Sequence, residues 1–437
     1  MPKKFTQKQI IIAAVGAVCV LGILFLLFSG GGSKKTPQPK ITLTVWGTDS
    51  HKVFGDLISS YDQYRTNATV KYVPLDPSDY ESKVLAALAA GNGPDVFEIG
   101  NRDLPKWQSV LAPMPTSTFM AQFDLAKLRS YFPSVVENDF VESGQIYALP
   151  LSIDTLAMIY NRDFFDSAGI ATPPATWNDF EADVAKLRVL NSEGQIVRAA
   201  AAIGGSETSI ANAPDILILL MIQNGATMTN ADFSSAEFAN EGTTGNTGLA
   251  AFNFYLQFAN AASPYYTWND GMGDAIQSFV QGKTAIIFGY QSALADIKAK
   301  APFLNVGVAA MPQPKDATIA VNYPNYDGLA VSKQGNVLSA WDFVLYLTTY
   351  TEGENIYLKD TGYPPAQRVA VTAAESDPNL AAFASQALSA RSWHEADSVG
   401  IDGIMNSAIR NALSGSVGPG QALNIAQSAI SALMSKR

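Results

Sequence analysis

The chain has 437 residues, 47% of them hydrophobic and 16% charged, and this length favours two domains. The formal net charge of −10 argues against nucleic acid as a partner, because binding to phosphates requires a basic surface. A single cysteine, Cys19, excludes an internal disulfide and a cysteine-based metal cluster, and two histidines leave little for a histidine metal site. We therefore expect a globular protein without a metal ion or other cofactor.

Near the N-terminus, residues 10–28 form an uninterrupted run of uncharged, mostly apolar residues. As a helix the run would be about 28 Å long, enough to cross a bilayer. Three lysines precede it, so the positive-inside rule predicts a cytoplasmic tail at 1–9, a transmembrane anchor at 10–28 and an extracytoplasmic remainder. Two alternatives stay open: a signal peptide cleaved after Phe28, and a lipoprotein signal at Cys19. The segment 29–40, rich in glycine and then in lysine and proline, is predicted to be a flexible linker.

Strand and helix patterns alternate after the linker. Residues 41–46, 69–74 and 95–99 are predicted strands, with helices over 54–64 and 80–90 between them. This order predicts an α/β domain with a mostly parallel sheet, in which ligands bind at the carboxyl ends of the strands. The first candidates at these strand ends are Trp46, Thr48, Asp49, Ser50, Glu98, Asn101 and Arg102. Of these, Trp46, Asp49, Ser50, Glu98 and Asn101 are the predicted ligand-binding residues.

Further strands are predicted at 284–288, 305–311 and 328–331, and the chain from 341 onward is predicted to be mainly helical. Two aromatic clusters lie in predicted loops. Trp268 follows two tyrosines, and Tyr326 stands between Asn325 and Asp327. Such aromatic residues either stack on a solute or pack the loops themselves, and the sequence leaves both alternatives open.

Several motifs, in order along the chain, resemble extracellular solute-binding protein family 1, which includes the maltose-binding proteins. The resemblance rests on TVWGTDS, LAALAAGNGPDVFEIGN, IYALPLSIDTLAMIYNRDFF with its following PPATWNDF, FVQGKTAIIFGYQSAL and DGLAVSKQGNVLSAWDFVLYLTT. It runs through the whole domain after the linker, from Ile41 to Met434. The resemblance implies a two-lobed, periplasmic-binding-protein-like fold of type II that closes on its solute by a hinge motion. It implies one lobe at about 41–150 and 307–350, and another at about 151–306 and 351–437.

The same resemblance implies particular contact residues. Asp154 matches a ligand-facing acid beyond the first hinge strand, and Asp49, Glu98 and Asn101 match contact loops of the first lobe. Tyr290 and Gln291 match a contact loop of the second lobe. Ser292 and Asp402 stand where maltose binders have tryptophan, which argues against maltodextrin itself as the solute.

The function implied is capture of a small polar solute outside the cytoplasm and its delivery to the permease of an ABC transporter. We expect a membrane-anchored monomer whose solute is first of all a sugar. A polyamine or another polar solute is the alternative, because Asp49, Glu98, Asp154, Asp327 and Tyr326 could surround an amine. Presentation of the solute to a sensor is a further alternative. An enzyme is not expected, because the sequence lacks G-x-S-x-G, H-E-x-x-H, Walker and G-x-G-x-x-G motifs. A glycosidase with a pair of catalytic carboxylates is the least favoured of the functional hypotheses.

Overall fold

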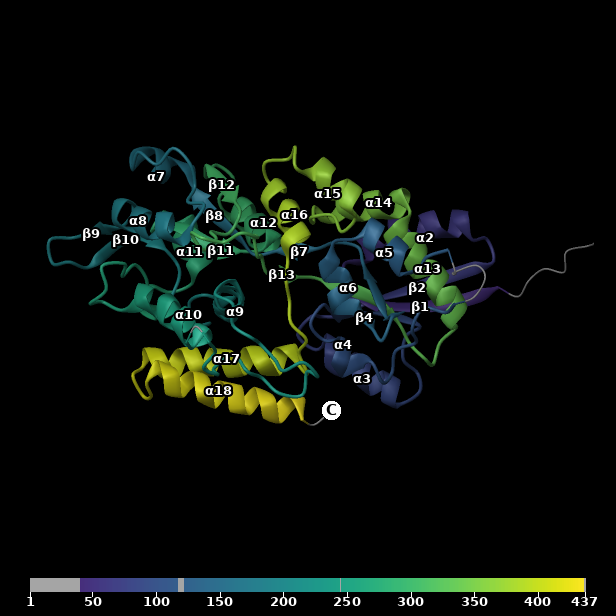
Figure 1. Ribbon diagram of the computed structural model, residues 1–437. Helices are drawn as coiled ribbons and strands as arrows, with labels where there is room; N and C mark the ends of the chain where they lie inside the picture. The colour runs from purple at the N-terminus through teal and green to yellow at the C-terminus, as the bar shows by residue number, and fades with distance from the viewer. Residues whose placement is uncertain (1–39, 117–121, 244, 436–437) are drawn as a thin grey trace, which may run out of the picture. The chain divides into compact units, whose positions relative to one another are not determined.

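Two mixed β-sheets form the framework of the protein in the computed structural model, which describes residues 40–116, 122–243 and 245–435 (Figure 1). The first sheet has the strand order β2-β1-β3-β14-β6. Its strands are β1 Ile41–Gly47, β2 Ala68–Pro74, β3 Val96–Gly100, β6 Ala148–Pro150 and β14 Asp327–Val331. Strands β1 and β3 are parallel, as predicted, whereas β14 runs antiparallel to β3 and β6.

The second sheet has the order β12-β8-β11-β10-β9. Its strands are β8 Ala157–Asn161, β9 Val189–Leu190, β10 Ile196–Ala201, β11 Thr284–Gly289 and β12 Val306–Ala309. Only β10 and β11 pair in parallel, and the other pairs are antiparallel. Two small two-stranded ribbons are also present in the described residues. They are β4 Val141–Glu142 with β5 Gln145–Ile146, and β7 Asp154–Thr155 with β13 Pro324–Asn325.

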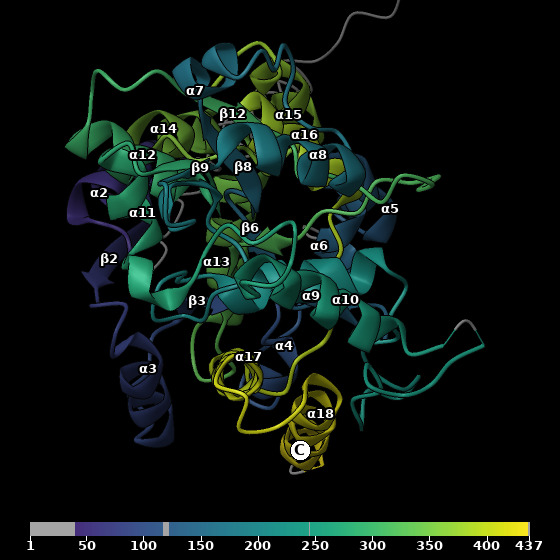
Figure 2. The same ribbon diagram turned by 90° about the vertical axis from the view of Figure 1, so that its left-hand side faces the viewer.

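Helices cover both sheets (Figures 1 and 2). Those of the N-terminal part are α2 His51–Tyr64, α3 Tyr80–Ala89, α4 Leu104–Trp107, α5 Leu125–Tyr131 and α6 Ser134–Phe140. The middle of the chain holds α7 Arg162–Ser167, α8 Trp177–Leu187, α9 Ala213–Gln223, α10 Thr247–Leu256, η1 Gln257–Ala259, η2 Asp270–Met272, α11 Ala275–Val280 and α12 Gln291–Lys300. The C-terminal part holds α13 Val337–Thr349, α14 Thr351–Thr361, α15 Arg368–Ala374, α16 Ala381–Gln386, η3 Ala387–Ser389, α17 Ser398–Leu413 and α18 Pro419–Met434.

Local sequence explains where several of these helices begin. Thr176 and Asp179 form a reciprocal capping box at α8, and the side chains of Asn161 and Asp397 accept backbone N–H groups at α7 and α17. Each cap satisfies an N–H group that the first helical turn leaves without a partner. Thr176 therefore fixes the start of α8.

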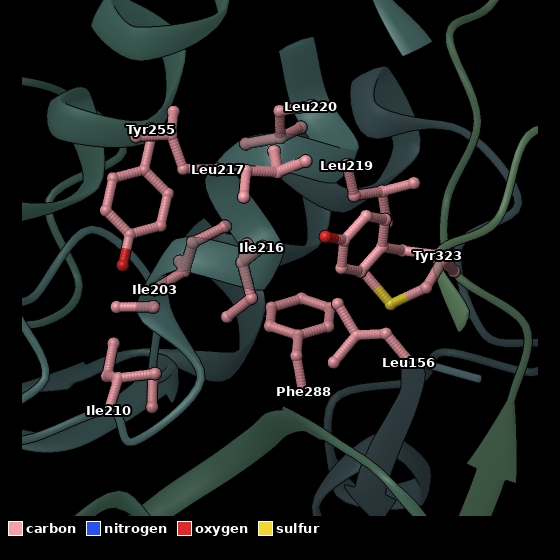
Figure 3. Packing of buried hydrophobic residues seen from close by; sticks show 14 of the residues in the cluster. Leu156, Ile203, Ile210, Ile216, Leu217, Leu219, Leu220, Tyr255, Phe288 and Tyr323 are labelled. Atoms are coloured by element: carbon pink, nitrogen blue, oxygen red, sulfur yellow. The ribbon is translucent and has the colours of Figure 1, made fainter. Parts of the chain in front are cut away.

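The core of the second lobe is continuous and largely aliphatic. Helix α9 is buried along almost its whole length, because APDILILLMIQ is apolar on every face. Figure 3 shows Ile216, Leu217, Leu219 and Leu220 of α9 lying between Tyr255 and Tyr323. A helix that is hydrophobic all round must be enclosed by neighbours, and here α10 and α17 help to enclose it.

Within the described residues, the strand order takes the chain twice between the two sheets. The first passage lies between β6 and β8, and the second between β12 and β14; β7 and β13, one from each passage, pair with each other. The predicted limit at 307 put β12 in the first lobe, but β12 pairs with β8 of the second sheet. The predicted limit at 351 put α14 in the second lobe, but α14 packs on α2. We therefore propose that the second passage follows β12 and that a third passage follows α14.

Among residues 40–116, 122–243 and 245–435, no helix combines the length and hydrophobicity that a bilayer crossing requires. The tail predicted at 1–9 and the anchor predicted at 10–28 lie outside the described residues, as does the linker at 29–40 apart from Lys40. Residues Thr42–Arg437 form a compact unit of their own.

Candidate functional site

A cavity of about 200 Å³ lies between the ends of strands from both sheets. Because β1 and β3 are parallel, with Val45 opposite Val96, their carboxyl ends reach the same edge of the first sheet. The second sheet contributes the turn that follows β11. The residues that line the cavity are Thr48, Asp49, Glu98, Leu151, Ser152, Asp154, Tyr290, Ser292, Asn325, Tyr326, Asp327, Leu329, Tyr357 and Tyr363.

Four of the lining residues are acidic: Asp49, Glu98, Asp154 and Asp327. The described residues that line the cavity include no lysine, arginine or histidine. A carboxylate that is partly removed from water is destabilised unless a hydrogen bond or a cation compensates. The hydrogen bonds that each carboxylate already accepts within the protein therefore decide how many more it can accept from a solute.

Glu98 is nine-tenths buried, with 9% of its surface exposed, and lies in β3 opposite Leu329 of β14. Its Oε2 accepts hydrogen bonds from the backbone N–H of Thr48 at 2.9 Å and from the Thr48 hydroxyl at 3.2 Å. Its Oε1 accepts no hydrogen bond from the described part of the chain. Desolvation, followed by the nearby charges of Asp327 and Asp49, raises the pKa of Glu98 to about 8.

Asp154 lies in β7, within the first passage between the sheets. Its Oδ2 accepts the backbone N–H of Gln291 at 2.8 Å, and its Oδ1 accepts the N–H of Thr155 at 2.8 Å. Gln291 is the first residue of α12, so this carboxylate also satisfies a free N–H group at a helix N-terminus. Burial raises the pKa of Asp154 to about 7 in spite of these two bonds.

Asp49 and Asp327 complete the acidic wall. The Tyr357 hydroxyl bonds to the carboxylate of Asp49, and the Tyr72 hydroxyl donates to the Asp49 carbonyl oxygen at 2.8 Å. The carboxylate of Asp327 accepts no hydrogen bond from the described residues. Desolvation and then the charges of Asp103 and Asp49 raise the pKa of Asp327 to about 6.

Two of the tyrosines in the wall use their hydroxyls inside the protein. The Tyr326 hydroxyl donates to Asp139 at 2.7 Å, and the Tyr290 hydroxyl donates to Asp215 at 2.7 Å. A tyrosine fixed in this way keeps its ring in one place, and a fixed ring is suited to stacking on a solute.

A buried ion cluster lies behind this cavity. The Arg102 guanidinium donates to both carboxylate oxygens of Glu395, at 3.1 and 3.3 Å, and to both of Asp402, at 3.1 Å each. Arg102 follows β3 of the first sheet, whereas Asp402 lies in α17, which packs on α9 of the second lobe. Close by, Ser398 donates to Asp103 through both its N–H and its hydroxyl, at 2.8 Å each. These bonds fasten the start of α17 to the first lobe.

The model of the family described as "Bacterial extracellular solute-binding protein" matches residues 57–382, well over half of the chain. The chain belongs to this family. Members of the family are solute-binding proteins that work outside the cytoplasm with ABC transporters, so the predicted family, the predicted solute-binding function and the extracytoplasmic position of the bulk of the chain are confirmed.

Known relatives agree with this assignment. A binding protein of Brucella abortus is 24% identical over 300 residues, which make up 68% of this chain and 67% of the relative. The sugar-binding protein MalE of Xanthomonas citri superposes with a TM-score of 0.74 at 19% identity, covering 91% of this chain and 98% of that chain. The cyclic α-maltosyl-1,6-maltose binding protein of Arthrobacter globiformis superposes with a TM-score of 0.73 at 17% identity, covering 91% of this chain and 100% of that chain. The predicted two-lobed, periplasmic-binding-protein-like fold is confirmed.

The structure brings half of the predicted site residues of this solute-binding protein into the cavity wall. Those that line it are Asp49, Glu98, Asp154, Tyr290, Tyr326 and Asp327. Two more lie just behind the wall: the side-chain amide of Asn101 donates to Asp139 at 3.1 Å, and Gln291 meets Asp154 through its backbone. Asp402 lines a neighbouring hollow, which also contains Asp215 and Tyr290, and its carboxylate is paired with Arg102.

The structure places three other predicted residues away from the cavity. Trp268 has no exposed surface, belongs to the core of the second lobe and donates its indole N–H to the Ser209 hydroxyl at 3.0 Å. A solute cannot reach a side chain in that position, so the ligand role predicted for Trp268 is corrected to core packing. Trp46 is half-buried in β1 and Ser50 is exposed at the start of α2, and neither lines the cavity.

Other lining residues were missing from the predicted site. Thr48, Ser292 and Asn325 are direct neighbours of predicted residues, so a wider choice at each loop would have included them. Tyr357 and Tyr363 had no local signal, because they lie in and just after α14, which the sequence assigned to the other lobe. Only the packing of α14 on α2 brings these tyrosines to the strand ends.

Proposed function

We propose that the cavity between the two sheets captures a small polar solute, first of all a sugar or short oligosaccharide, and that the protein delivers it to an ABC permease. The observation that carries this proposal is that polar side chains from both lobes line one cavity. Carboxylates such as Asp49 and Glu98 accept hydrogen bonds from hydroxyl groups, and tyrosine rings cover the apolar faces of a sugar. A solute that contacts both lobes stabilises a closed arrangement by its differential affinity for that arrangement.

Hinge closure follows from the way the chain connects the lobes. The short β7–β13 ribbon joins the two passages at the cavity, with Asp154 opposite Asn325. Small changes of backbone angle in such short segments rotate whole lobes while leaving each sheet intact. The solute is bound and released without covalent change, since family members are binding proteins. We propose that the captured form is a monomer.

Small-angle X-ray scattering of a chain beginning at residue 41 should show a smaller radius of gyration when a bound sugar saturates the cavity. The same sugar should be recovered unchanged by mass spectrometry after prolonged incubation. The chain without solute, measured at the same ionic strength, is the control. An unchanged radius at saturation would contradict hinge closure, and hydrolysis of the sugar would contradict a pure binding role.

We also propose that residues 10–28 remain attached as a membrane anchor, with 1–9 in the cytoplasm and 29–40 as the tether. The apolar run, its preceding lysines and the family's extracytoplasmic position support this arrangement. Protease added to intact cells with a permeable envelope should digest the folded part while the anchor stays with the membrane. Recovery of a soluble form that begins near residue 30 would show instead that the segment is cleaved.

A further inference from the structure

The cavity wall holds four acids, and no described lining residue carries a positive charge that could pair with them. Three of its four acids belong to the first lobe: Asp49 follows β1, Glu98 lies in β3, and Asp327 begins β14. They are close enough for their charges to act on one another, since those of Asp49 and Asp327 raise the pKa of Glu98, and that of Asp49 raises the pKa of Asp327. A neutral solute would remove water from these carboxylates without compensating their charge.

Buried acids elsewhere in the same region have partners. Asp139 accepts hydrogen bonds from Asn101, Tyr326 and Ser392, Asp103 accepts two from Ser398, and Glu395 is paired with Arg102. Proteins pair buried polar groups in this way almost everywhere, so a carboxylate oxygen that faces a cavity without a protein partner remains available to a solute.

Glu98 has one oxygen without such a partner among the described residues, and Asp327, which is not buried but exposed at the cavity, has two. Glu98 is nine-tenths buried and lines the cavity, yet its Oε1 accepts no hydrogen bond from the described residues. Neither oxygen of the Asp327 carboxylate accepts one within that same part of the chain. These three oxygens are free acceptors at the cavity, where a solute with N–H donors can reach them.

The other lining residues suit an organic cation better than a metal ion. Tyr290, Tyr326, Tyr357 and Tyr363 all line the cavity, and the faces of aromatic rings attract positive charge. Across the described residues, no group of three or more His, Cys, Asp or Glu side chains is arranged to hold a metal ion. The lining therefore suits an organic cation that can contact aromatic rings and carboxylates together.

We propose that the solute carries a protonated amine, which donates hydrogen bonds to Glu98 and Asp327, so that the captured molecule is an amino sugar or a similar hydroxylated amine. This inference rests on the proposed function, since it concerns the same cavity. An ammonium group has three donors and no acceptor, which matches oxygens that only accept. Bonds between charged partners are shorter and stronger than neutral ones.

The proposed contact also predicts a dependence on pH. The titratable groups that face Glu98 are the carboxylates of Asp49 and Asp327 and the hydroxyls of Tyr72, Tyr80, Tyr357 and Tyr363. None of them brings a positive charge, so Glu98 must lose its proton when the amine binds. Amine binding should therefore release protons and become tighter as the pH rises from 6 to 8, whereas binding of a neutral sugar should not.

Matched pairs of solutes test this inference on the full-length protein in an uncharged detergent. The pairs are D-glucosamine with D-glucose, the glucosamine disaccharide with N,N′-diacetylchitobiose, and putrescine with 1,4-butanediol, measured by calorimetry at pH 7.5. We expect the amine of at least one hydroxylated pair to bind at least ten-fold more tightly than its neutral partner. Equal binding within the sugar pairs would overturn the amine inference and leave the proposed function in place. Putrescine as the only binder would overturn the hydroxylated part of the inference, and no binding by any probe would count against both proposals.

Variants locate the contact. Glu98→Gln and Asp327→Asn keep the shape of each side chain and remove its charge, so each should reduce the preference for the amine by at least ten-fold. Asp56→Asn makes the same change of charge on the exposed face of α2 and should leave the preference unchanged. Melting temperatures without solute check folding, and neither cavity variant should melt below the unsubstituted protein. If the two cavity variants weakened amine and neutral sugar equally, the proposed contact would be wrong.

Discussion

Replacing Arg102 by methionine should lower the free energy of unfolding by about 3–5 kcal/mol, the scale on which breaking a buried ion pair destabilises a protein. Arg102 is the partner of Glu395, whose side chain has no exposed surface. Removing the guanidinium leaves that carboxylate buried without a cation, and it also frees Asp402. Methionine fills much of the same volume, so the loss reflects charge rather than a cavity. Urea unfolding followed by tryptophan fluorescence measures the change.

Arg129→Met is the matched control for this prediction. Arg129 also forms a bidentate pair, with Glu137 at 2.7 and 2.6 Å, but its side chain is 60% exposed. An exposed pair is screened by water and contributes little to stability, so this variant should lose much less than Arg102→Met. The double variant Arg102→Met, Glu395→Met should regain part of the stability, because no charge is then left buried. Equal losses for the two single variants would show that the Arg102 cluster contributes no more than a surface pair.

The strands that carry the site could be predicted because their signals are local. The apolar runs at 41–46, 69–74 and 95–99 each end in turn residues, and the structure has β1, β2 and β3 at these places. Once two strands are parallel, their carboxyl ends meet at one edge. Asp49 and Glu98 could therefore be placed together from the sequence alone.

The remaining parts of the site depend on contacts between distant segments. Trp268 is of a residue type that often stacks on solutes. Its burial, however, depends on packing against distant segments of the core, and the neighbouring tyrosines in the sequence do not reveal that packing. Asp402 could be aligned with a ligand-facing position, yet its pairing with Arg102 depends on how α17 docks against the end of β3. The strand β12 has an ordinary strand pattern, and only its pairing with β8 decides which sheet it joins.

Without solute, the protein should become less stable as the pH rises from 5 to 8. Burial raises the pKa of Glu98 to about 8, and those of Asp154 and Asp139 to about 7. In the unfolded chain these acids lose their protons near pH 4. Between pH 4 and the raised pKa, the folded protein therefore binds more protons than the unfolded chain, and stability falls as pH rises.

Urea midpoints measured at pH 5, 6, 7 and 8 test this sign. Glu98→Gln should flatten the curve up to about pH 8, because the amide does not ionise, and Asp154→Asn should flatten it up to about pH 7. Asp56→Asn, on the exposed face of α2, should leave the slope as it is. A midpoint that rises between pH 5 and 8 would mean that the cavity acids are already stabilised as anions in the empty protein. The amine would then have no uncompensated carboxylate charge to bind. The urea midpoints and the paired solutes therefore test in two independent ways whether the cavity carboxylates lack a compensating partner in the empty protein.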